Sequence, residues 1–204
     1  MMKSSFVLFD LDNTLYPPSC GVLQEINRRI GLFCADYFGI DAAEADDMRR
    51  GKFRIYGTTL QWLRVCHGLE DPESYIKAIH PENMVDYVKP DPRLRLFISE
   101  LPVDYILLTN SPMEHALRTL KALNLEDLFP RIWDLRRMDF RGKPHPETYR
   151  RVLADLGLRA GDALLVDDSK INIEGFNHIG GNTLHVDNTP ISEWTKQLSL
   201  ILEA

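Results

Sequence analysis

The stretch that decides the fold is SFVLFDLDNT, residues 5–14. Its first half is a continuous, mostly apolar run, which is typical of a strand buried on both faces of a parallel sheet. The run stops at Asp10, and a second carboxylate, Asp12, follows two residues later. Ligands of open α/β sheets bind beyond the carboxyl ends of the strands. The stretch therefore predicts a parallel sheet with an acidic site at its edge.

Strand-like and helical patterns alternate after residue 90. Further strands are expected near residues 103–109, 132–135, 163–166 and 182–186. Helices are expected between them, beginning near residues 92, 111, 146, 169 and 192. Ser111 and Glu114 form a capping-box pattern, and Ser169 is a favourable N-cap residue. Because strand–helix alternation gives right-handed βαβ units, the sequence predicts an α/β protein with a Rossmann-like, doubly wound parallel sheet of about five strands.

The segment between the first strand and residue 89 has a helical pattern instead. Apolar residues recur at steps of three and four from Val22 onward, and Gly39 ends that pattern. Shorter helices are expected near residues 42–50, 58–66 and 72–79. The segment is too long for a simple crossover. We therefore expect residues 18–88 to form an inserted α-helical cap, and residues 1–17 and 89–204 to form the catalytic core.

Composition limits the classes of partner. The chain has 204 residues, with 24 Lys+Arg against 30 Asp+Glu and a formal net charge of −6, which argues against affinity for nucleic acid or anionic lipid. Its three cysteines are few and odd in number, which favours a reducing compartment. No apolar stretch approaches the ~20 residues that a membrane helix needs. We expect a cytoplasmic protein, a monomer or homodimer, that binds a small molecule.

Polar residues follow the ends of three predicted strands, and a lysine lies in a nearby loop. The set is Asp10, Asp12, Thr109, Asn110, Lys143, Asp167 and Asp168. Crowded carboxylates repel one another, so they are usually accompanied by a cation, and oxygen-only ligands indicate Mg²⁺. Lys143 would add positive charge, and Thr109 with the following helix start would form an anion site. Together these groups predict a site for a phosphoryl group.

The same residues indicate how a phosphoryl group would be transferred. The sequence has neither GxxxxGK[ST] nor GxGxxG, which favours a phosphoester over ATP as the phosphate donor. With no Ser/His/Asp or Cys/His arrangement, an aspartate is the natural nucleophile. Asp10 is the candidate, and it would form an aspartyl-phosphate. Asp12 could protonate the leaving oxygen and then activate water.

Four motifs resemble those of the haloacid dehalogenase superfamily of phosphohydrolases. They are DLDNTL at residues 10–15, LLTN at 107–110, KP at 143–144 and VDDS at 166–169. They occur in the order found in that superfamily and span the whole predicted core. The resemblance implies a Mg²⁺-dependent phosphohydrolase with a helical cap that closes over small substrates.

The resemblance also implies roles for the acidic residues. Asp10 matches the nucleophile, which is also a Mg²⁺ ligand. Asp12 matches the general acid/base, whose backbone carbonyl also binds the metal. Asp168 matches the acidic metal ligand of the fourth motif, and Asp167 beside it is a direct or water-mediated ligand.

Thr109 and Asn110 match the pair that holds the substrate phosphate, and Lys143 matches the lysine that neutralises charge. Two further residues lie near these motifs. For Asn172, catalysis and support of the local turn remain equal alternatives. For His145, a surface or capping role is favoured over a place in the site.

A narrower resemblance is to the pyrimidine 5′-nucleotidase branch. It rests on FDLDNTLYP at residues 9–17, YGTTL at 56–60 and VDDSKIN at 166–172. It implies a nucleoside 5′-monophosphate of the pyrimidine type as substrate. The basic run from Arg49 to Arg54 is interpreted first as a solvated face and second as a site for substrate phosphate or carboxylate.

Several alternatives stay open. The substrate could be another small phosphometabolite, such as phosphoglycolate, a sugar phosphate or pyridoxal phosphate. A phosphomutase would share both aspartates but exclude water, whereas a haloacid dehalogenase is disfavoured because carbon–halogen displacement does not need Asp12. From a different class, a phosphorylation switch or a non-catalytic binding module would not turn over phosphate esters rapidly.

Overall fold

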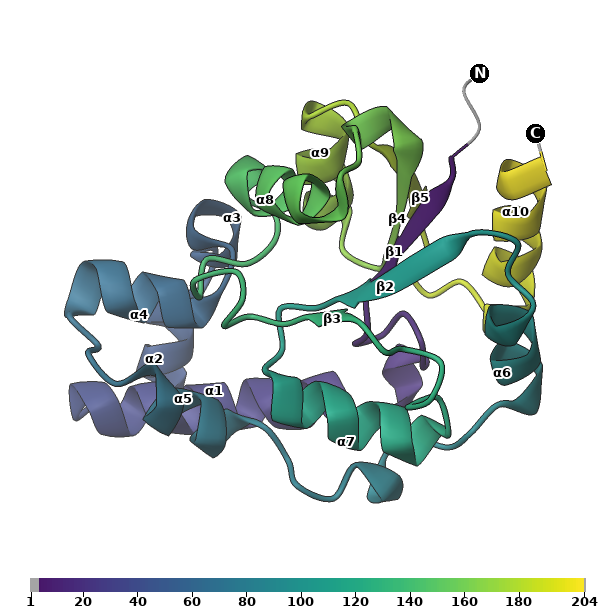
Figure 1. Ribbon diagram of the computed structural model, residues 1–204. Coiled ribbons are helices and arrows are strands. Elements are labelled where there is room, and N and C mark those ends of the chain that lie inside the picture. Colours follow the sequence, from purple (N-terminus) through teal and green to yellow (C-terminus); the bar gives the residue numbers. More distant parts are fainter. Residues whose placement is uncertain (1–3, 204) are drawn as a thin grey trace.

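The computed structural model describes residues 4–203 and contains one parallel sheet (Figure 1). Its strands are β1 (Phe6–Phe9), β2 (Asp104–Leu108), β3 (Ile132–Trp133), β4 (Ala163–Asp167) and β5 (Asn182–His185). They lie in the order β3-β2-β1-β4-β5, and every neighbouring pair is parallel. The strand order reverses at β1, which is the doubly wound arrangement. The predicted Rossmann-like fold is confirmed; residues 1–3 and 204 of the predicted core lie outside the described residues.

Helices lie between the strands as the alternating pattern predicts. They are α1 (Val22–Phe38), α2 (Ala42–Arg49), α3 (Phe53–Tyr56), α4 (Thr59–His67), α5 (Pro72–Ile79), α6 (Pro92–Ser99), α7 (Met113–Leu123), α8 (Pro146–Leu156), α9 (Lys170–His178) and α10 (Ile191–Glu203). Short 3-10 helices are η1 (Pro18–Cys20), η2 (Met84–Asp86) and η3 (Ala160–Asp162). Within residues 4–203, no helix has both the length and the apolar character needed to cross a membrane.

The sheet is buried on both faces, because helices cover each of them (Figure 1). Successive side chains of a strand point to opposite faces. Val7 and Phe9 of β1 therefore pack in the cluster that includes residues of α6, α7 and α10. Phe6 and Leu8 pack in the cluster that includes residues of α8 and α9. This two-sided burial explains why the strand reads as a continuous apolar run.

Helices α1 to α5 lie between β1 and α6, beside the carboxyl edge of the sheet (Figure 1). We call residues 18–88 the insertion. Gly39 ends α1 with a φ of 67°, a left-handed conformation that glycine adopts without strain. One buried apolar cluster includes sheet residues such as Val7 and insertion residues such as Ile30 and Leu63. The insertion and the sheet therefore share a hydrophobic core.

One predicted helix cap is wrong, and a second has the predicted position without the side-chain hydrogen bond. Pro112 occupies the N-cap position of α7, and the Ser111 hydroxyl instead donates a hydrogen bond to Asp12 Oδ2 at 2.6 Å. Ser169 does stand at the N-cap of α9, but its side chain makes no capping hydrogen bond. Its backbone N–H donates to Asp167 Oδ1 at 2.9 Å. At Ser111, a side-chain contact with an aspartate of the site thus replaces the local cap.

Candidate active site

The acidic residues converge because β1 and β4 are neighbours in register. Phe9 pairs with Val166, so the residues that follow both strands emerge together at the carboxyl edge. The Asp10 backbone N–H also donates to the Val166 carbonyl at 2.9 Å. Asp10, Asp167 and Asp168 each place one carboxylate oxygen within 4.8 Å of the others. The predicted convergence of residues from distant parts of the chain is thus present.

Lys143 lies at the centre of this cluster and is almost completely buried, with 1% of its surface exposed. Its Nζ donates to Asp10 Oδ1 at 2.7 Å and to Asp167 Oδ2 at 2.6 Å. Burial would lower the pKa of Lys143, but the two carboxylates outweigh burial and raise its pKa above the usual range. Lys143 is therefore a fixed ammonium ion that balances part of the acidic charge.

The loop that carries Lys143 is held on both of its backbone groups. Asn110 Oδ1 accepts from the Lys143 backbone N–H at 2.7 Å, and Asn110 Nδ2 donates to the Lys143 carbonyl at 2.9 Å. Gly142 has a φ of 69°, and a Cβ there would lie 2.6 Å from Asn110 Oδ1. Only glycine fits this approach. Asn110, predicted to hold phosphate, therefore also positions the lysine.

Residues of the insertion pack closely against the same loop. Gly57 has a φ of 76°, and a Cβ there would lie 2.9 Å from the Lys143 carbonyl oxygen. His145 Nε2 lies 3.0 Å from the Tyr56 carbonyl oxygen. His145 therefore bridges the loop and the insertion, and it makes no side-chain cap at the start of α8.

Asp167 and Asp168 differ in what their carboxylates can still bind. Asp167 is fully buried, and besides Lys143 and the Ser169 N–H it accepts from Asn172 Nδ2 at 3.0 and 3.1 Å. Asp168 lines the cavity and accepts from Asn13 Nδ2 at 3.3 Å. The protein's own donors thus already engage both oxygens of Asp167. Asn172 supports this carboxylate rather than only the local turn.

The cluster has three carboxylates against one ammonium group, so a further cation would offset its negative charge. Burial, reinforced by Asp167, raises the pKa of Asp168 to about 6. Burial likewise raises the pKa of Asp10 well above its usual range, although Lys143 opposes the rise. A nearby divalent cation would favour the charged form of both carboxylates.

The oxygen atoms present fit such a cation. Asn13 and Asn172 are each more than nine-tenths buried, and both line the cavity. Within residues 4–203, the Oδ1 atom of each has no hydrogen-bond partner. These two amide oxygens and the carboxylates of Asp10 and Asp168 all line the cavity, and such oxygen donors suit Mg²⁺ better than a metal that prefers nitrogen or sulfur.

Asp12 is held by three donors, and sequence reasoning missed two of them. The Tyr16 hydroxyl donates to Asp12 Oδ1 at 2.5 Å, and His115 Nε2 lies 2.8 Å from the same atom. Ser111 donates to Oδ2. Burial would raise the pKa of Asp12, but the nearby His115 and the three hydrogen bonds outweigh burial and hold the pKa well below its usual range. In this geometry Asp12 is ionised.

The missed residues have one weak sequence signal in common, which is helical spacing. Tyr16 follows Asp12 by four residues, and His115 follows Ser111 by four, so each pair could share one side of a helical turn. His115 is fully buried, and its ring lies 4.9 Å from the ring of His80, which comes from the insertion. Burial lowers the pKa of His80 to about 4, so that ring is neutral near pH 7.

Thr109 is the one predicted phosphate-binding residue that the structure places behind the site. Its side chain is fully buried, and its Oγ1 accepts a hydrogen bond from the Ser111 backbone N–H at 3.0 Å. Asn110 and Ser111, which follow it, line the cavity instead. The hydroxyl of Thr109 therefore shapes the turn that presents its neighbours.

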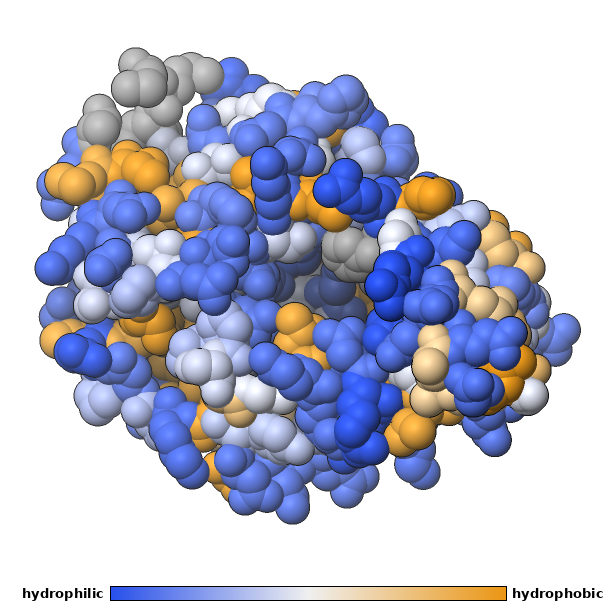
Figure 2. Space-filling model, turned by 180° about the vertical axis from the view of Figure 1, so that it is seen from behind, coloured by the Kyte–Doolittle hydropathy of each residue, from blue (hydrophilic) through white to orange (hydrophobic). Residues whose placement is uncertain are grey.

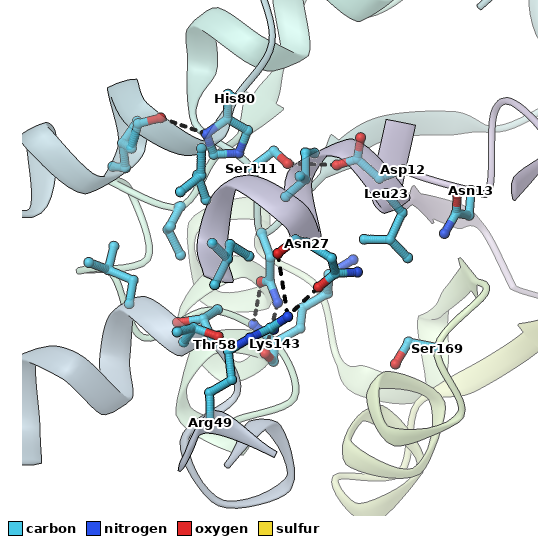
Figure 3. A pocket seen from close by; sticks show the side chains of 18 of the residues that line it. Asp12, Asn13, Leu23, Asn27, Arg49, Thr58, His80, Ser111, Lys143 and Ser169 are labelled. Atoms are coloured by element: carbon cyan, nitrogen blue, oxygen red, sulfur yellow. Dashed lines mark hydrogen bonds between the residues drawn. The ribbon is translucent and has the colours of Figure 1, made fainter. Parts of the chain in front are cut away.

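A cavity of about 680 Å³ joins these residues to the insertion. Figure 2 shows this face of the molecule hollowed between the core and the insertion, with hydrophilic and some hydrophobic residues around the hollow. Figure 3 shows Asp12 and Ser111 along one side of a pocket, and Lys143 of the core and Asn27 and Arg49 of the insertion also line it. A molecule in this cavity would contact the core with one end and the insertion with the other.

These features place the chain among hydrolases of Rossmann-like fold, and a comparison with protein families specifies which. The family model described as haloacid dehalogenase-like hydrolase matches residues 5–180. The chain therefore belongs to the haloacid dehalogenase-like hydrolase family.

Two individual relatives are each 28% identical to this chain. The chain is 28% identical over 193 residues to "Phosphate metabolism protein 8" of Saccharomyces cerevisiae, covering 87% of this chain and 60% of the yeast protein. It is 28% identical over 185 residues to "Phosphorylated carbohydrates phosphatase" of Thermotoga maritima, covering 85% and 81%. This chain thus spans about 60% of the length of the yeast relative. A solved haloacid dehalogenase-like hydrolase from Porphyromonas gingivalis has the same fold, with a TM-score of 0.63, 18% identity and full coverage of both chains.

Proposed function

We propose that this protein is a Mg²⁺-dependent phosphomonoesterase that works through an aspartyl-phosphate on Asp10. The observation that carries the proposal is the buried Lys143, which contacts both Asp10 and Asp167 at the edge of a cavity. The names of the two relatives, one a phosphatase and one a phosphate metabolism protein, support the same chemistry.

The proposed reaction has two steps. Asp10 attacks phosphorus, the bond to the leaving oxygen breaks, and Asp12 gives that oxygen a proton. Water then attacks the aspartyl-phosphate, Asp12 takes a proton from the water, and inorganic phosphate leaves with Asp10 restored. Asp12 is ionised in its present contacts, which suits the second step. The first step requires Asp12 to lose at least one of those contacts and gain a proton.

The other residues hold charge during both steps. Lys143 stays close to the phosphoryl group and balances its negative charge. Asn110 fixes the position of that lysine, and Asp167 orients its ammonium group. Asp10, Asp168 and the backbone carbonyl of Asp12 would hold Mg²⁺. Bound there, the metal would offset the charge of the phosphoryl oxygens.

For the substrate, we propose a nucleoside 5′-monophosphate of the pyrimidine type. A cavity of about 680 Å³ has room for a leaving group as large as a nucleoside. The insertion, residues 18–88, would act as the cap that closes over it. We further propose that the protein acts in the cytoplasm, as a monomer or homodimer.

The test is a panel of phosphate esters scored for released phosphate with Mg²⁺ and with EDTA. Nucleotides, sugar phosphates, phosphoglycolate and pyridoxal phosphate make up the panel. Fast, Mg²⁺-dependent release from pyrimidine 5′-monophosphates is expected. Rearranged sugar phosphate without free phosphate would indicate a mutase, and a long-lived acyl phosphate without turnover would indicate a phosphorylation switch. Either result would overturn the proposal.

A further inference from the structure

The insertion contributes a polar cluster to the cavity, formed by Asn27 of α1 with Asp46 and Arg49 of α2. Arg49 Nε donates to Asp46 Oδ1 at 2.7 Å. The two terminal nitrogens of Arg49 donate to Asn27, one to Oδ1 and one to the carbonyl oxygen, both at 3.4 Å. Arg49 is therefore tied to both helices, with one fifth of its side chain exposed.

The close packing of α1 against α2 keeps this cluster in place. A Cβ at Gly31 would lie 2.9 Å from Asp46 Oδ1, so the absence of a side chain at Gly31 leaves room for the carboxylate. Asp46 in turn fixes the direction of the Arg49 guanidinium, because the fork of an arginine is planar and rigid. The donors of the cluster are thus pre-organised at the cavity wall.

The charge of this cluster indicates what it can bind. Asp46 neutralises Arg49, so the pair leaves no net positive charge for a carboxylate or a second phosphate. The neighbouring Arg50 also lines the cavity, but it is paired with Asp47, and both of these side chains are largely exposed. The cluster therefore fits an uncharged group that accepts hydrogen bonds. The two long Arg49–Asn27 contacts are weak enough to be exchanged for better ones.

Most of the rest of this wall is apolar, although Arg50, Thr58, Thr59 and His80 also line it. It is lined by the buried side chains of Ile26, Ile30, Leu60, Tyr75, Ile76 and Ile79. A polyhydroxylated sugar would leave many of its hydroxyls unpaired there, which disfavours its binding. A flat heterocycle can bury its faces against the apolar side chains and direct its polar edge to the Asn27–Arg49–Asp46 cluster.

We propose that Asn27 and Arg49 recognise the hydrogen-bonding edge of an uncharged nucleobase in the leaving group. Arg49 donates to ring carbonyl oxygens, and the Asn27 amide can donate or accept. This inference rests on the proposed nucleotidase function, because it assigns the base of that substrate to a place in the cavity. It makes the two residues specificity-determining, and it gives them no part in the transfer of the phosphoryl group.

The experiment compares two substrates that share the same ribose 5′-oxygen as leaving atom. Uridine 5′-monophosphate carries the base, and ribose 5-phosphate lacks it. For Asn27→Ala and Arg49→Met, kcat/KM on the nucleotide is expected to fall about 10- to 100-fold, mostly through KM. On ribose 5-phosphate the fall is expected to stay within about threefold.

A milder substitution replaces Arg49→Met if that variant folds poorly, and a second variant serves as the control. Arg49→Lys retains the charge beside Asp46 but lacks the planar fork, and it is expected to show the same loss of preference for the nucleotide. Arg28→Met removes an exposed ion pair with Glu25 on α1, outside the residues lining the cavity, and it is expected to leave both rates unchanged. Thermal unfolding of each variant reports on its fold.

Equal losses on both substrates, or no loss on either, would overturn the inference. A wild-type protein that hydrolyses ribose 5-phosphate but not nucleotides would also overturn it, together with the nucleotide assignment, while the phosphatase proposal would stand. A wild-type protein that hydrolyses no phosphate ester would instead contradict the proposed function itself.

Discussion

The two walls of the cavity differ in how their charged side chains are balanced. On the core wall, Asp10, Asp167 and Asp168 crowd around one ammonium group, and the pKa values of Asp10 and Asp168 are raised. On the insertion wall, Arg49 and Asp46 neutralise each other among apolar side chains. The core wall has three carboxylates against one ammonium group, so a cation would offset its charge, whereas the two charges of the insertion wall cancel each other. This difference suggests that the core carries the chemistry and the insertion selects the leaving group.

The largest effect is expected from Asp10→Asn, because it removes the proposed nucleophile. Turnover should fall at least about 10⁴-fold, measured as phosphate released in excess Mg²⁺. Asp104→Asn is the matched control, since Asp104 is exposed and pairs with Phe6 at the opposite edge of the sheet. More than trace activity in Asp10→Asn would show that Asp10 is not the nucleophile.

Removal of metal comes next. Treatment with EDTA should lower turnover about 10³-fold or more, because the metal contributes several kcal/mol to the stabilisation of charge in the transition state. Added Mg²⁺ should restore activity and raise the unfolding temperature, since it binds the folded protein. Full activity in EDTA, checked after exhaustive dialysis, would show that the acidic residues of the core wall need no cation for turnover.

Asp12→Ala tests the general acid/base. We expect a loss of about 10²- to 10⁴-fold in kcat with an unchanged fold, because proton transfer contributes roughly that factor. The loss should be smaller for an ester with an acidic leaving group such as p-nitrophenol, which needs no proton to depart. Equal losses for p-nitrophenyl phosphate and an alkyl phosphate would argue that Asp12 acts only through structure.

The smallest expected effect concerns stability. The pKa of Asp168 rises from its ordinary value of 3.8 to about 6 in the folded protein, so the folded state favours the protonated form. The carboxylate therefore costs stability as pH rises through this range, and the full cost is present above pH 6. In EDTA, Asp168→Asn should therefore raise the free energy of unfolding by about 1–2 kcal/mol at pH 7.5 and by almost nothing at pH 4. The figure at pH 7.5 is smaller than the full pKa shift implies, because Asp168 is partly exposed and solvent screens its charge.

Urea unfolding at both pH values measures this difference. Saturating Mg²⁺ provides the internal control, because it should reverse the order at pH 7.5 by stabilising only the wild type. An Asn variant that is less stable than wild type in EDTA at pH 7.5 would contradict the view that the core wall holds unfavourable charge.

The sheet and its acidic residues were predictable because both depend on local sequence. A strand buried on two faces must be continuously apolar, and carboxylates that follow such strands must meet at one edge. Two of the three supports of Asp12 were not predictable in the same way. Ser111 and His115 are about a hundred residues away in sequence, and their contacts depend on how α7 meets the turn after β1.

Local rules also failed where tertiary contacts offered better partners. Ser111 fits a capping box, yet its hydroxyl binds Asp12 instead. Arg49 and Arg50 belong to one basic run, first interpreted as a solvated face. Both side chains line the cavity, but Arg50 is largely exposed as that interpretation requires, whereas Arg49 packs between α1 and α2. Periodicity alone gave no reason to separate these neighbours.

The apolar cluster shared by the sheet and the insertion has a consequence for protein engineering. Val22, Ile26 and Ile30 of α1 belong to the same buried cluster as Val7 and the rest of one sheet face. An insertion transplanted from another family member would have to reproduce that buried contact surface as well as the two chain junctions. Chimaeras spliced only at residues 17 and 89 should therefore melt earlier than either parent, unless the contacting side chains are exchanged with them.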